Sequence, residues 1–358
     1  MKKKLLSTAL LAVLTLSTLA GCGAGSTKNS ASSGQTKTAE SSATASPKTT
    51  AAPRIKIRVA YMPNLGSASS LVTAINKGYF NEEGIDVETV KFEKGPEEIA
   101  AMGSGNIDIA QIGHGAHVLA AKGQARIFNI DQTSNGDELL ANKDKGIKSV
   151  EDLKGKTIAT SLGTSSEIIL NLALKSKGMT QKDVKVVQMD PSAAVTAMVT
   201  GNVDAAAIWS PSTIVVKEKM GDKVISLASN NDYRDQAVFP GSWVCTNDYY
   251  KNNQDKLVRF TQAILKAQHY RKEHISEVAG WLAKLIGQDP ATLAKSTGEG
   301  DWLTDDFIYG MAKDGTLKKW YENQQKLFID SGALDKAVNV DNYFSPDIIT
   351  KAYEANKK

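Results

Sequence analysis

The sequence of 358 residues contains only two cysteines, Cys22 and Cys245. Two residues cannot supply the cysteine pairs of a zinc or iron–sulfur site, so that kind of metal centre is excluded. Cys245 lies in the apolar run 242–246, which predicts a buried, inert thiol rather than a nucleophile. If Cys22 is modified, as argued next, Cys245 has no disulfide partner.

Long apolar runs are also missing, and this excludes a membrane-spanning helix. The longest candidate is the uncharged stretch Leu5–Ala20, which follows Lys2–Lys4 and is too short to span a bilayer. It leads into Leu19-Ala20-Gly21-Cys22, and small residues before a cysteine are typical of the lipobox of bacterial lipoproteins. We interpret residues 1–21 as a lipoprotein signal peptide and Cys22 as the lipidated first residue. The alternative is a plain signal peptide with an incidental cysteine.

Residues 23–53 lack leucine, isoleucine, valine and every aromatic residue. Seven serines, six threonines and seven alanines make up most of this segment. It cannot bury enough apolar surface to offset the entropy lost on ordering. Residues 22–53 are therefore predicted to be the lipidated cysteine and a disordered tether, with a folded body that starts near Arg54.

The chain has little excess charge once the signal peptide is set aside. Its formal net charge is +4, and three of those charges come from Lys2, Lys3 and Lys4. A nearly neutral body argues against nucleic acid or an acidic membrane surface as the main partner.

Established catalytic motifs are absent too. The complete phosphate-binding loop and the Gly-x-Ser-x-Gly elbow do not occur. His114 and His117 could suggest a metal pair, but no cysteine or carboxylate cluster adjoins them, so no metal and no cofactor is expected. Asp108 and Asp204 precede buried strands, which favours turn or capping roles over acid–base chemistry.

What the chain does contain is an internal repeat of about 96 residues. Gly105-Asn106-Ile107-Asp108 matches Gly201-Asn202-Val203-Asp204, and Leu65-Gly66 matches Leu162-Gly163. Each half shows a β-branched strand, a Gly/Ser/Thr loop, an apolar-periodic helix, a second strand, a second helix and a third strand. Strands that alternate with helices predict parallel-rich α/β sheets flanked by helices, in two successive lobes. The segment after about Asp255 is mostly helical and is expected to pack on the first lobe.

Ligands of open α/β sheets bind outside the carboxyl ends of the strands. The loops expected there are 62–70, 113–116, 161–166 and 209–212. Two of these loops lead into predicted helices and contain a glycine and several hydroxyl side chains. The N-terminus of a helix attracts small anions even where no lysine or arginine is present. Simple N-capping is the alternative for these hydroxyls. His114 and Trp209 each follow a strand and are candidates to line the cleft, although a structural role suits either.

Several segments together resemble the nitrate/sulfonate/taurine family of solute-binding proteins of ABC importers. They are Lys77-Gly78-Tyr79-Phe80, Glu83–Val87, Gly105–Asp108 with Ile112-Gly113, Ser149–Lys156, Gly201–Asp204 and Trp209-Ser210-Pro211. The similarity runs from about residue 55 to 275.

The resemblance implies a two-lobed periplasmic-binding-protein-like fold of type II, with a ligand cleft between the lobes. Lobe one would comprise residues 54–140 and 241–358, and lobe two 141–240. The protein would be an extracytoplasmic monomer, lipid-anchored to the bacterial cell membrane, that passes a small anionic ligand to an ABC permease and its ATPase. The ligand-binding residues implied are Asn64, Gly66, Ser67, Gly113, His114, Ser161, Gly163, Thr164, Ser165, Trp209, Ser210 and Trp243.

One departure from the family leaves alternatives open. Relatives often carry an acid where this chain has Ser210, and its absence weakens a taurine assignment. The same superfamily includes binders of pyrimidine vitamin precursors and flavins, which the aromatic residues Tyr61, Trp209 and Trp243 would suit. An enzyme of pyrimidine-precursor synthesis is a further alternative, but this chain lacks clustered cysteines. A receptor that presents the ligand to a sensor is another.

Overall fold

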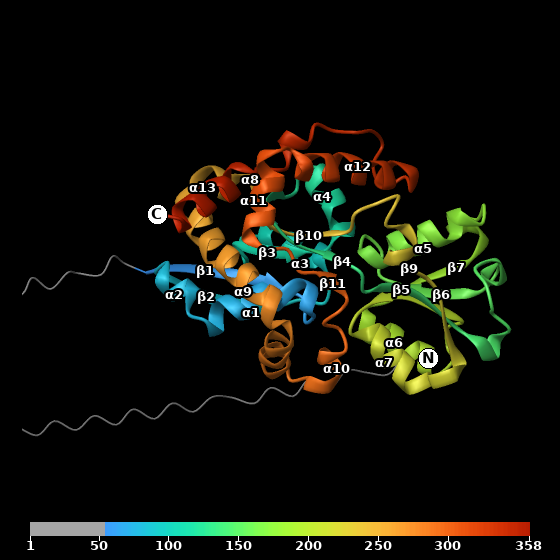
Figure 1. Cartoon of the computed structure of the whole chain (residues 1–358). Helices are drawn as coiled ribbons and strands as arrows, with labels where there is room; N and C mark the ends of the chain where they lie inside the picture. Colours follow the sequence, from blue (N-terminus) through green and yellow to red (C-terminus); the bar gives the residue numbers. More distant parts are fainter. Residues whose placement is uncertain (1–53) are drawn as a thin grey trace, which may run out of the picture. The chain divides into compact units, whose positions relative to one another are not determined.

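The computed structural model describes residues 54–358 (Figure 1). The predicted signal peptide, Cys22 and the tether lie outside the described residues. Within residues 54–358, no helix has both the length and the apolar character that a membrane crossing requires.

Two β-sheets form the framework of the described residues. The first has the strand order β11-β4-β10-β3-β1-β2, and the second has the order β7-β6-β8-β5-β9. We call each sheet together with the helices on its faces a lobe. The first sheet contains β1 (Ile55–Tyr61), β2 (Ile85–Lys91), β3 (Ile109–Ile112), β4 (Arg126–Ser134), β10 (Pro240–Cys245) and β11 (Gly300–Asp301). The second contains β5 (Asp137–Asn142), β6 (Thr157–Thr160), β7 (Lys185–Gln188), β8 (Ala205–Trp209) and β9 (Val224–Ser229).

The internal repeat is visible in both sheets. The parallel triplet β3-β1-β2 of the first lobe corresponds to β8-β6-β7 of the second. Next to each triplet lies one antiparallel strand, β10 in the first lobe and β5 in the second. The predicted α/β architecture is therefore confirmed, with an antiparallel strand in each sheet.

The chain crosses between the lobes twice. The first crossing is the short link of Asn135 and Gly136, and the second is the segment 230–239. The sequence boundary at residue 140 would divide β5, which in the structure belongs wholly to the second sheet. β5 begins with the polar residues Asp137 and Glu138, and its apolar residues begin only at Leu139. The sequence pattern therefore indicates a strand only after its true start.

Helices cover both faces of each sheet (Figure 1). In the first lobe, α1 and the long α9 pack together on one face, and the other carries α3, α4, α11 and α13. In the second lobe, α5 covers one face, and α6 and α7 the other. Their bounds are α1 Leu65–Asn76, α2 Tyr79–Glu82, α3 Gly95–Gly103, α4 His117–Ala121, α5 Ser165–Ser176, α6 Pro191–Val199, α7 Ser212–Met220, α8 Asn247–Asn252, α9 Gln254–Ile286, α10 Pro290–Ala294, α11 Asp305–Lys313, α12 Thr316–Asp330 and α13 Asp347–Asn356.

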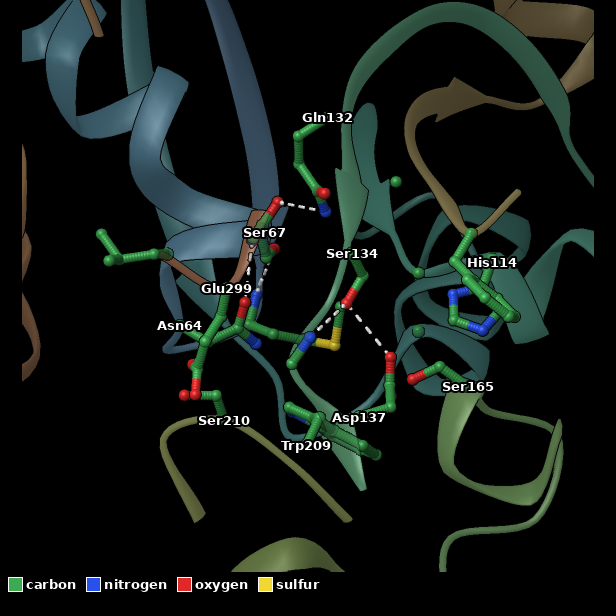
Figure 2. A pocket seen from close by; sticks show the side chains of 18 of the residues that line it. Asn64, Ser67, His114, Gln132, Ser134, Asp137, Ser165, Trp209, Ser210 and Glu299 are labelled. Atoms are coloured by element: carbon green, nitrogen blue, oxygen red, sulfur yellow. Dashed lines mark hydrogen bonds between the residues drawn. The ribbon is translucent and has the colours of Figure 1, made fainter. Parts of the chain in front are cut away.

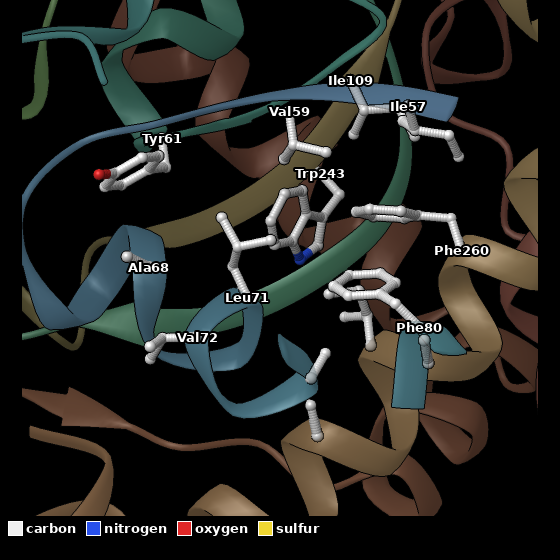
Figure 3. Packing of buried hydrophobic residues seen from close by; sticks show 14 of the residues in the cluster. Ile57, Val59, Tyr61, Ala68, Leu71, Val72, Phe80, Ile109, Trp243 and Phe260 are labelled. Carbon is white, nitrogen blue, oxygen red and sulfur yellow. The ribbon is translucent and has the colours of Figure 1, made fainter. Parts of the chain in front are cut away.

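The C-terminal helices pack mainly on the first lobe, as expected. Two apolar stripes, one ending at Ala267 and one beginning at Ile275, belong to the single helix α9, whose backbone is non-helical at His274. Phe260 of α9 stacks at a tilt on Phe80 and edge-on against Trp243, with ring centroids 5.3 and 5.2 Å apart (Figure 3). This cluster fixes α9 to the sheet that forms one wall of the site.

Asp108 and Asp204 hold equivalent backbone positions in the two lobes. Asp108 accepts a hydrogen bond from the backbone N–H of Arg58, and Asp204 accepts one from Thr157, each at 2.8 Å. Asp108 thus ties the loop before β3 to β1, and Asp204 ties the loop before β8 to β6. The predicted turn or capping role is confirmed in this form.

Removing either carboxylate is expected to destabilise the fold. Asp204→Ala should lower the free energy of unfolding by about 1.5–3 kcal/mol, because a hydrogen bond to a charged acceptor is lost. Urea denaturation of the full chain measures this. Asp144→Ala is the control, since its exposed ion pair with Lys223 should contribute less than about 1 kcal/mol. Equal effects in the two variants would contradict a special role for Asp204.

Candidate functional site

A pocket lies between the lobes and is lined by residues of both. It sits where strands end and helices α1 and α5 begin, as the strand-end rule predicts. Nine of the twelve residues expected from the sequence line it: Asn64, Gly66, Ser67, Gly113, His114, Thr164, Ser165, Trp209 and Ser210.

The N-terminus of α1 forms one wall. Asn64 caps this helix by accepting a hydrogen bond from the backbone N–H of Ser67 at 2.9 Å. The hydroxyl of Ser67 accepts a bond from the N–H of Met62, so it fixes the loop. Gln111 and Gln132 each donate a side-chain N–H to the carbonyl oxygen of Gly66, at 3.1 and 3.4 Å. The capping role proposed as an alternative is therefore present at this helix.

The N-terminus of α5 faces the pocket from the second lobe. Thr164 donates its hydroxyl to the carbonyl of Ser161 at 2.6 Å, and the N–H of Gly163 is bound by the carboxylate of Glu167 at 2.7 Å. No side chain caps the helix at Thr164. Ser165, the first helical residue, points its hydroxyl toward Asp137 (Figure 2).

The lobes touch each other beside the pocket. Gly115 of the first lobe lies so close to Thr164 and Ser165 that a β-carbon at this position would overlap with their backbone atoms. On the same side, the ammonium of Lys94 pairs with the carboxylate of Asp190 at 2.6 Å. Lys94 and Asp190 precede α3 and α6, which are equivalent helices in the repeat. The structure therefore shows the arrangement in which the two lobes meet.

Three expected site residues do not line the pocket. Ser161 donates its hydroxyl to the carbonyl of Met189, and Gly163 supplies a turn with φ of +74°. Trp243 is fully buried in the core of the first lobe, against Phe260 (Figure 3). The expectation for Trp243 was wrong because β10 runs antiparallel to its neighbour β3, so its first residues reach the pocket. Gly241 lines the pocket in its place.

His114 lines the pocket but is 1% exposed and packs against the ring of Phe239, with centroids 4.8 Å apart. Burial lowers the pKa of His114 to about 3, so its ring is neutral at physiological pH. Its Nε2 atom has no hydrogen-bond partner in the structure. A neutral ring with one free nitrogen can bind a polar group but adds no positive charge to the pocket.

Two carboxylates in the pocket were missed by the sequence analysis. Asp137 opens β5 directly after the first crossing, and Glu299 lies just before β11. Burial raises the pKa of Asp137 to about 6, which the hydroxyl of Ser165 partly opposes, and burial raises the pKa of Glu299 to about 7. No motif surrounds either residue, and only their spatial convergence reveals them. Among the lining residues there is no lysine or arginine.

The family model described as NMT1/THI5 like matches residues 67–277, which is more than half of the chain. This chain belongs to that family. The match begins at Ser67 and includes pocket residues of both lobes, whereas the lining residues at 62–66 and 296–302 lie outside it. The α/β fold with a cleft between two lobes agrees with the resemblance noted from the sequence.

Relatives of this NMT1/THI5-like chain include binding proteins. A Brucella abortus protein, named only as a candidate binding protein, is 32% identical and covers 85% of this chain and 94% of its own length. The taurine-binding periplasmic protein of Escherichia coli is 25% identical and covers 79% of this chain and 84% of its own.

Solved structures share the fold at low sequence identity. The alkanesulfonate-binding protein SsuA of Xanthomonas axonopodis, bound to MOPS, has a TM-score of 0.64 and 21% identity, over 82% of this chain and 99% of its own. The desulfurization enzyme DszB has a TM-score of 0.60 and 16% identity, over 84% and 99%. Since both a binding protein and an enzyme have this fold, the fold alone does not separate binding from catalysis.

Proposed function

We propose that this chain is the solute-binding protein of an ABC importer. It holds a small solute in the pocket between its lobes and delivers the solute to a permease driven by an ATPase. The observation that supports this most is the pocket itself, to which the equivalent loops of the repeat contribute Asn64–Ser67 and Thr164–Ser165. A pocket shared between two lobes can close on a solute and reopen, because only two chain crossings connect the lobes.

The proposal includes a membrane anchor. Residues 1–21 would be removed as a signal peptide, and lipid on Cys22 would hold the protein at the outer face of the bacterial cell membrane. The tether 22–53 would let the body reach the permease. The periplasmic location in the name of the E. coli relative supports an extracytoplasmic site for this chain. The protein would act as a monomer, since both walls of the pocket come from one chain.

The nature of the solute is a separate question. The names of the E. coli and Xanthomonas proteins favour a sulfonate or a similar small anion. The aromatic side chains of Trp209, Phe239 and Trp302 in the pocket favour a flat organic solute, such as a pyrimidine precursor or a flavin-like vitamin. Both classes belong in a binding screen.

The test is a thermal-shift screen of the full chain followed by calorimetry. The panel contains aliphatic sulfonates, taurine, nitrate, pyrimidine precursors and flavins. A true ligand present at 100 times its Kd should stabilise the protein by about 2.7 kcal/mol. Trp209→Ala should weaken binding by roughly tenfold, because Trp209 lines the pocket and offers a large contact area. If no small solute stabilises the chain, the binding function is refuted.

A further inference from the structure

We infer that the solute carries a cationic, hydrogen-bond-donating nitrogen group that binds between the carboxylates of Asp137 and Glu299. This rests on the proposed binding function and deepens it by naming a ligand class. An ammonium, an amidinium or a protonated amino-heterocycle has this chemistry.

The pocket contains buried polar atoms that lack hydrogen-bond partners. Two of them, His114 Nε2 and Ser210 Oγ, can accept or donate according to where their proton lies, and the hydroxyl of Ser210 lies near Glu299. The other four can only accept. They are Asp137 Oδ1, Glu299 Oε2, Gln111 Oε1 and Gln132 Oε1. The two glutamine side chains donate their nitrogens to the carbonyl of Gly66, so their oxygens are the free ends. Buried polar groups are nearly always satisfied, and leaving one without a partner costs about 1–3 kcal/mol. A ligand rich in donors would satisfy these four atoms, whereas a sulfonate or nitrate offers only further acceptors.

Asp137 is held so that one of its oxygens stays free. Its Oδ2 accepts a hydrogen bond from the hydroxyl of Ser134 at 3.1 Å, and its backbone N–H donates to Asn230 at 2.7 Å. The side chain is 1% exposed, and the hydroxyl of Ser165 points toward it, but Oδ1 makes no hydrogen bond of normal length and angle. Figure 2 shows Asp137 beside Trp209 and Ser165, within the ring of residues around the pocket. A buried carboxylate held in this way, with one oxygen available, can accept a hydrogen bond from a ligand.

Glu299 reaches the pocket from the first lobe. Its backbone carbonyl accepts a hydrogen bond from the N–H of Asn135 at 2.9 Å, which fixes this segment to the first crossing. A β-carbon at Gly136 would lie 3.3 Å from the Glu299 β-carbon, so the side chain packs directly on the crossing. In Figure 2, Glu299 lies near Asn64 and Ser210. Ser210 packs on the same glycine, since a β-carbon at Gly136 would lie 3.2 Å from the Ser210 β-carbon.

The charge of the surroundings agrees with a cationic ligand. Asp137 and Glu299 are the charged lining residues, and His114 is neutral. Lys217, which acts on Glu299 from outside the lining, is paired with Glu138. Burial raises the pKa of both carboxyls to values near physiological pH, which disfavours their charged forms. A cation bound between them would favour the charged forms again. An anion would instead add repulsion in a pocket without a compensating side-chain cation.

The experiment compares matched probes on the full chain by calorimetry. One pair is taurine and isethionate, which differ only in an ammonium and a hydroxyl. A second pair is 4-aminopyrimidine and pyrimidine. In each pair the nitrogen donor should bind at least tenfold more tightly. The affinity for taurine should also rise between pH 5 and pH 8, because its ammonium stays protonated throughout, the carboxyls that titrate near 6 and 7 ionise in this interval, and His114 stays neutral.

Variants connect the preference to the two carboxylates. Asp137→Asn and Glu299→Gln should each reduce the preference for the nitrogen donor to less than threefold and flatten its pH dependence. At pH 8 each ligand-free variant should melt at the same or a higher temperature than the parent, because a buried, half-satisfied charge is removed. Asp222→Asn, at an exposed site of the second lobe, is the matched control and should change neither readout.

The outcomes separate the two levels of the proposal. Equal or tighter binding of isethionate and pyrimidine, or lower melting temperatures in both carboxylate variants at pH 8, would overturn the ligand class and leave the binding function intact. If no probe and no member of the wider panel bound, the proposed function would fail and this inference with it.

Discussion

Replacing Gly115 with alanine should reduce solute affinity more than 100-fold while leaving each lobe folded. The added methyl group would overlap with backbone atoms of Thr164 and Ser165 across the contact between the lobes. Backbone atoms at the start of a helix cannot move aside as the end of a flexible side chain can. The overlap is therefore relieved only by moving the lobes apart, and this opens the pocket. A 100-fold loss corresponds to about 2.7 kcal/mol of binding free energy.

Calorimetry with the strongest solute from the screen measures the loss. Small-angle scattering measures the separation of the lobes, and the radius of gyration of Gly115→Ala with solute should match that of the solute-free parent. Gly103→Ala is the control, because Gly103 is exposed at the end of α3 and a β-carbon there meets nothing within 4 Å. Parental affinity in Gly115→Ala would show that solute binding does not need this contact between lobes.

Replacing Arg271 with methionine should cost about 3–5 kcal/mol of unfolding free energy, the largest stability loss expected for a single substitution here. The guanidinium of Arg271 donates to Asp131 Oδ1 at 2.9 Å and to the Asp131 carbonyl at 2.7 Å. Both side chains are fully buried. The same guanidinium donates to Ser69 of α1, so one residue joins α9, β4 and α1 behind the pocket. Without Arg271, the Asp131 carboxyl is left in the core without its cationic partner.

Urea denaturation of the full chain tests this prediction. The double variant Arg271→Met with Asp131→Leu should recover most of the loss, because it leaves no buried charge unpaired. Lys318→Met is the control, since its ion pair with Asp341 is exposed and should contribute less than about 1 kcal/mol. A loss in Arg271→Met no larger than in Lys318→Met would mean that the buried pair does not hold the core together.

The elements of the fold were predictable because their signals are local. The strand Ile55–Tyr61 and the helix Leu65–Asn76 follow from β-branched and apolar periodicity, and their equivalents Thr157–Thr160 and Ser165–Ser176 recur about 100 residues later. The approximate positions of the two crossings came from the family resemblance. Where β5 begins did not follow from the sequence, because its first residues, Asp137 and Glu138, look like a polar loop.

The candidate site was predictable in part for the same reason. Asn64, Ser67, Thr164 and Ser165 lie at helix N-termini that follow strands, and such positions are recognisable from adjacent residues. Trp243 was misplaced because its side chain depends on the direction of β10, and that is set by the chain returning from the second lobe. Gly115 looked like one glycine among many, and its tight contact involves backbone nearly fifty residues away in the chain.

By itself, the sequence determined that this protein is a repeated α/β structure with two hydroxyl-rich helix N-termini at its strand ends. Periodicity, composition and the repeat carry that information, and each is a property of neighbouring residues. The tertiary structure alone decided the charge of the pocket. Asp137 and Glu299 are far apart in the sequence and belong to different lobes, and the crossing at Asn135–Gly136 brings them to the same pocket. The helix ends favour an anion, whereas the carboxylates and the free acceptor atoms favour a donor, because burial makes an unpaired acceptor costly.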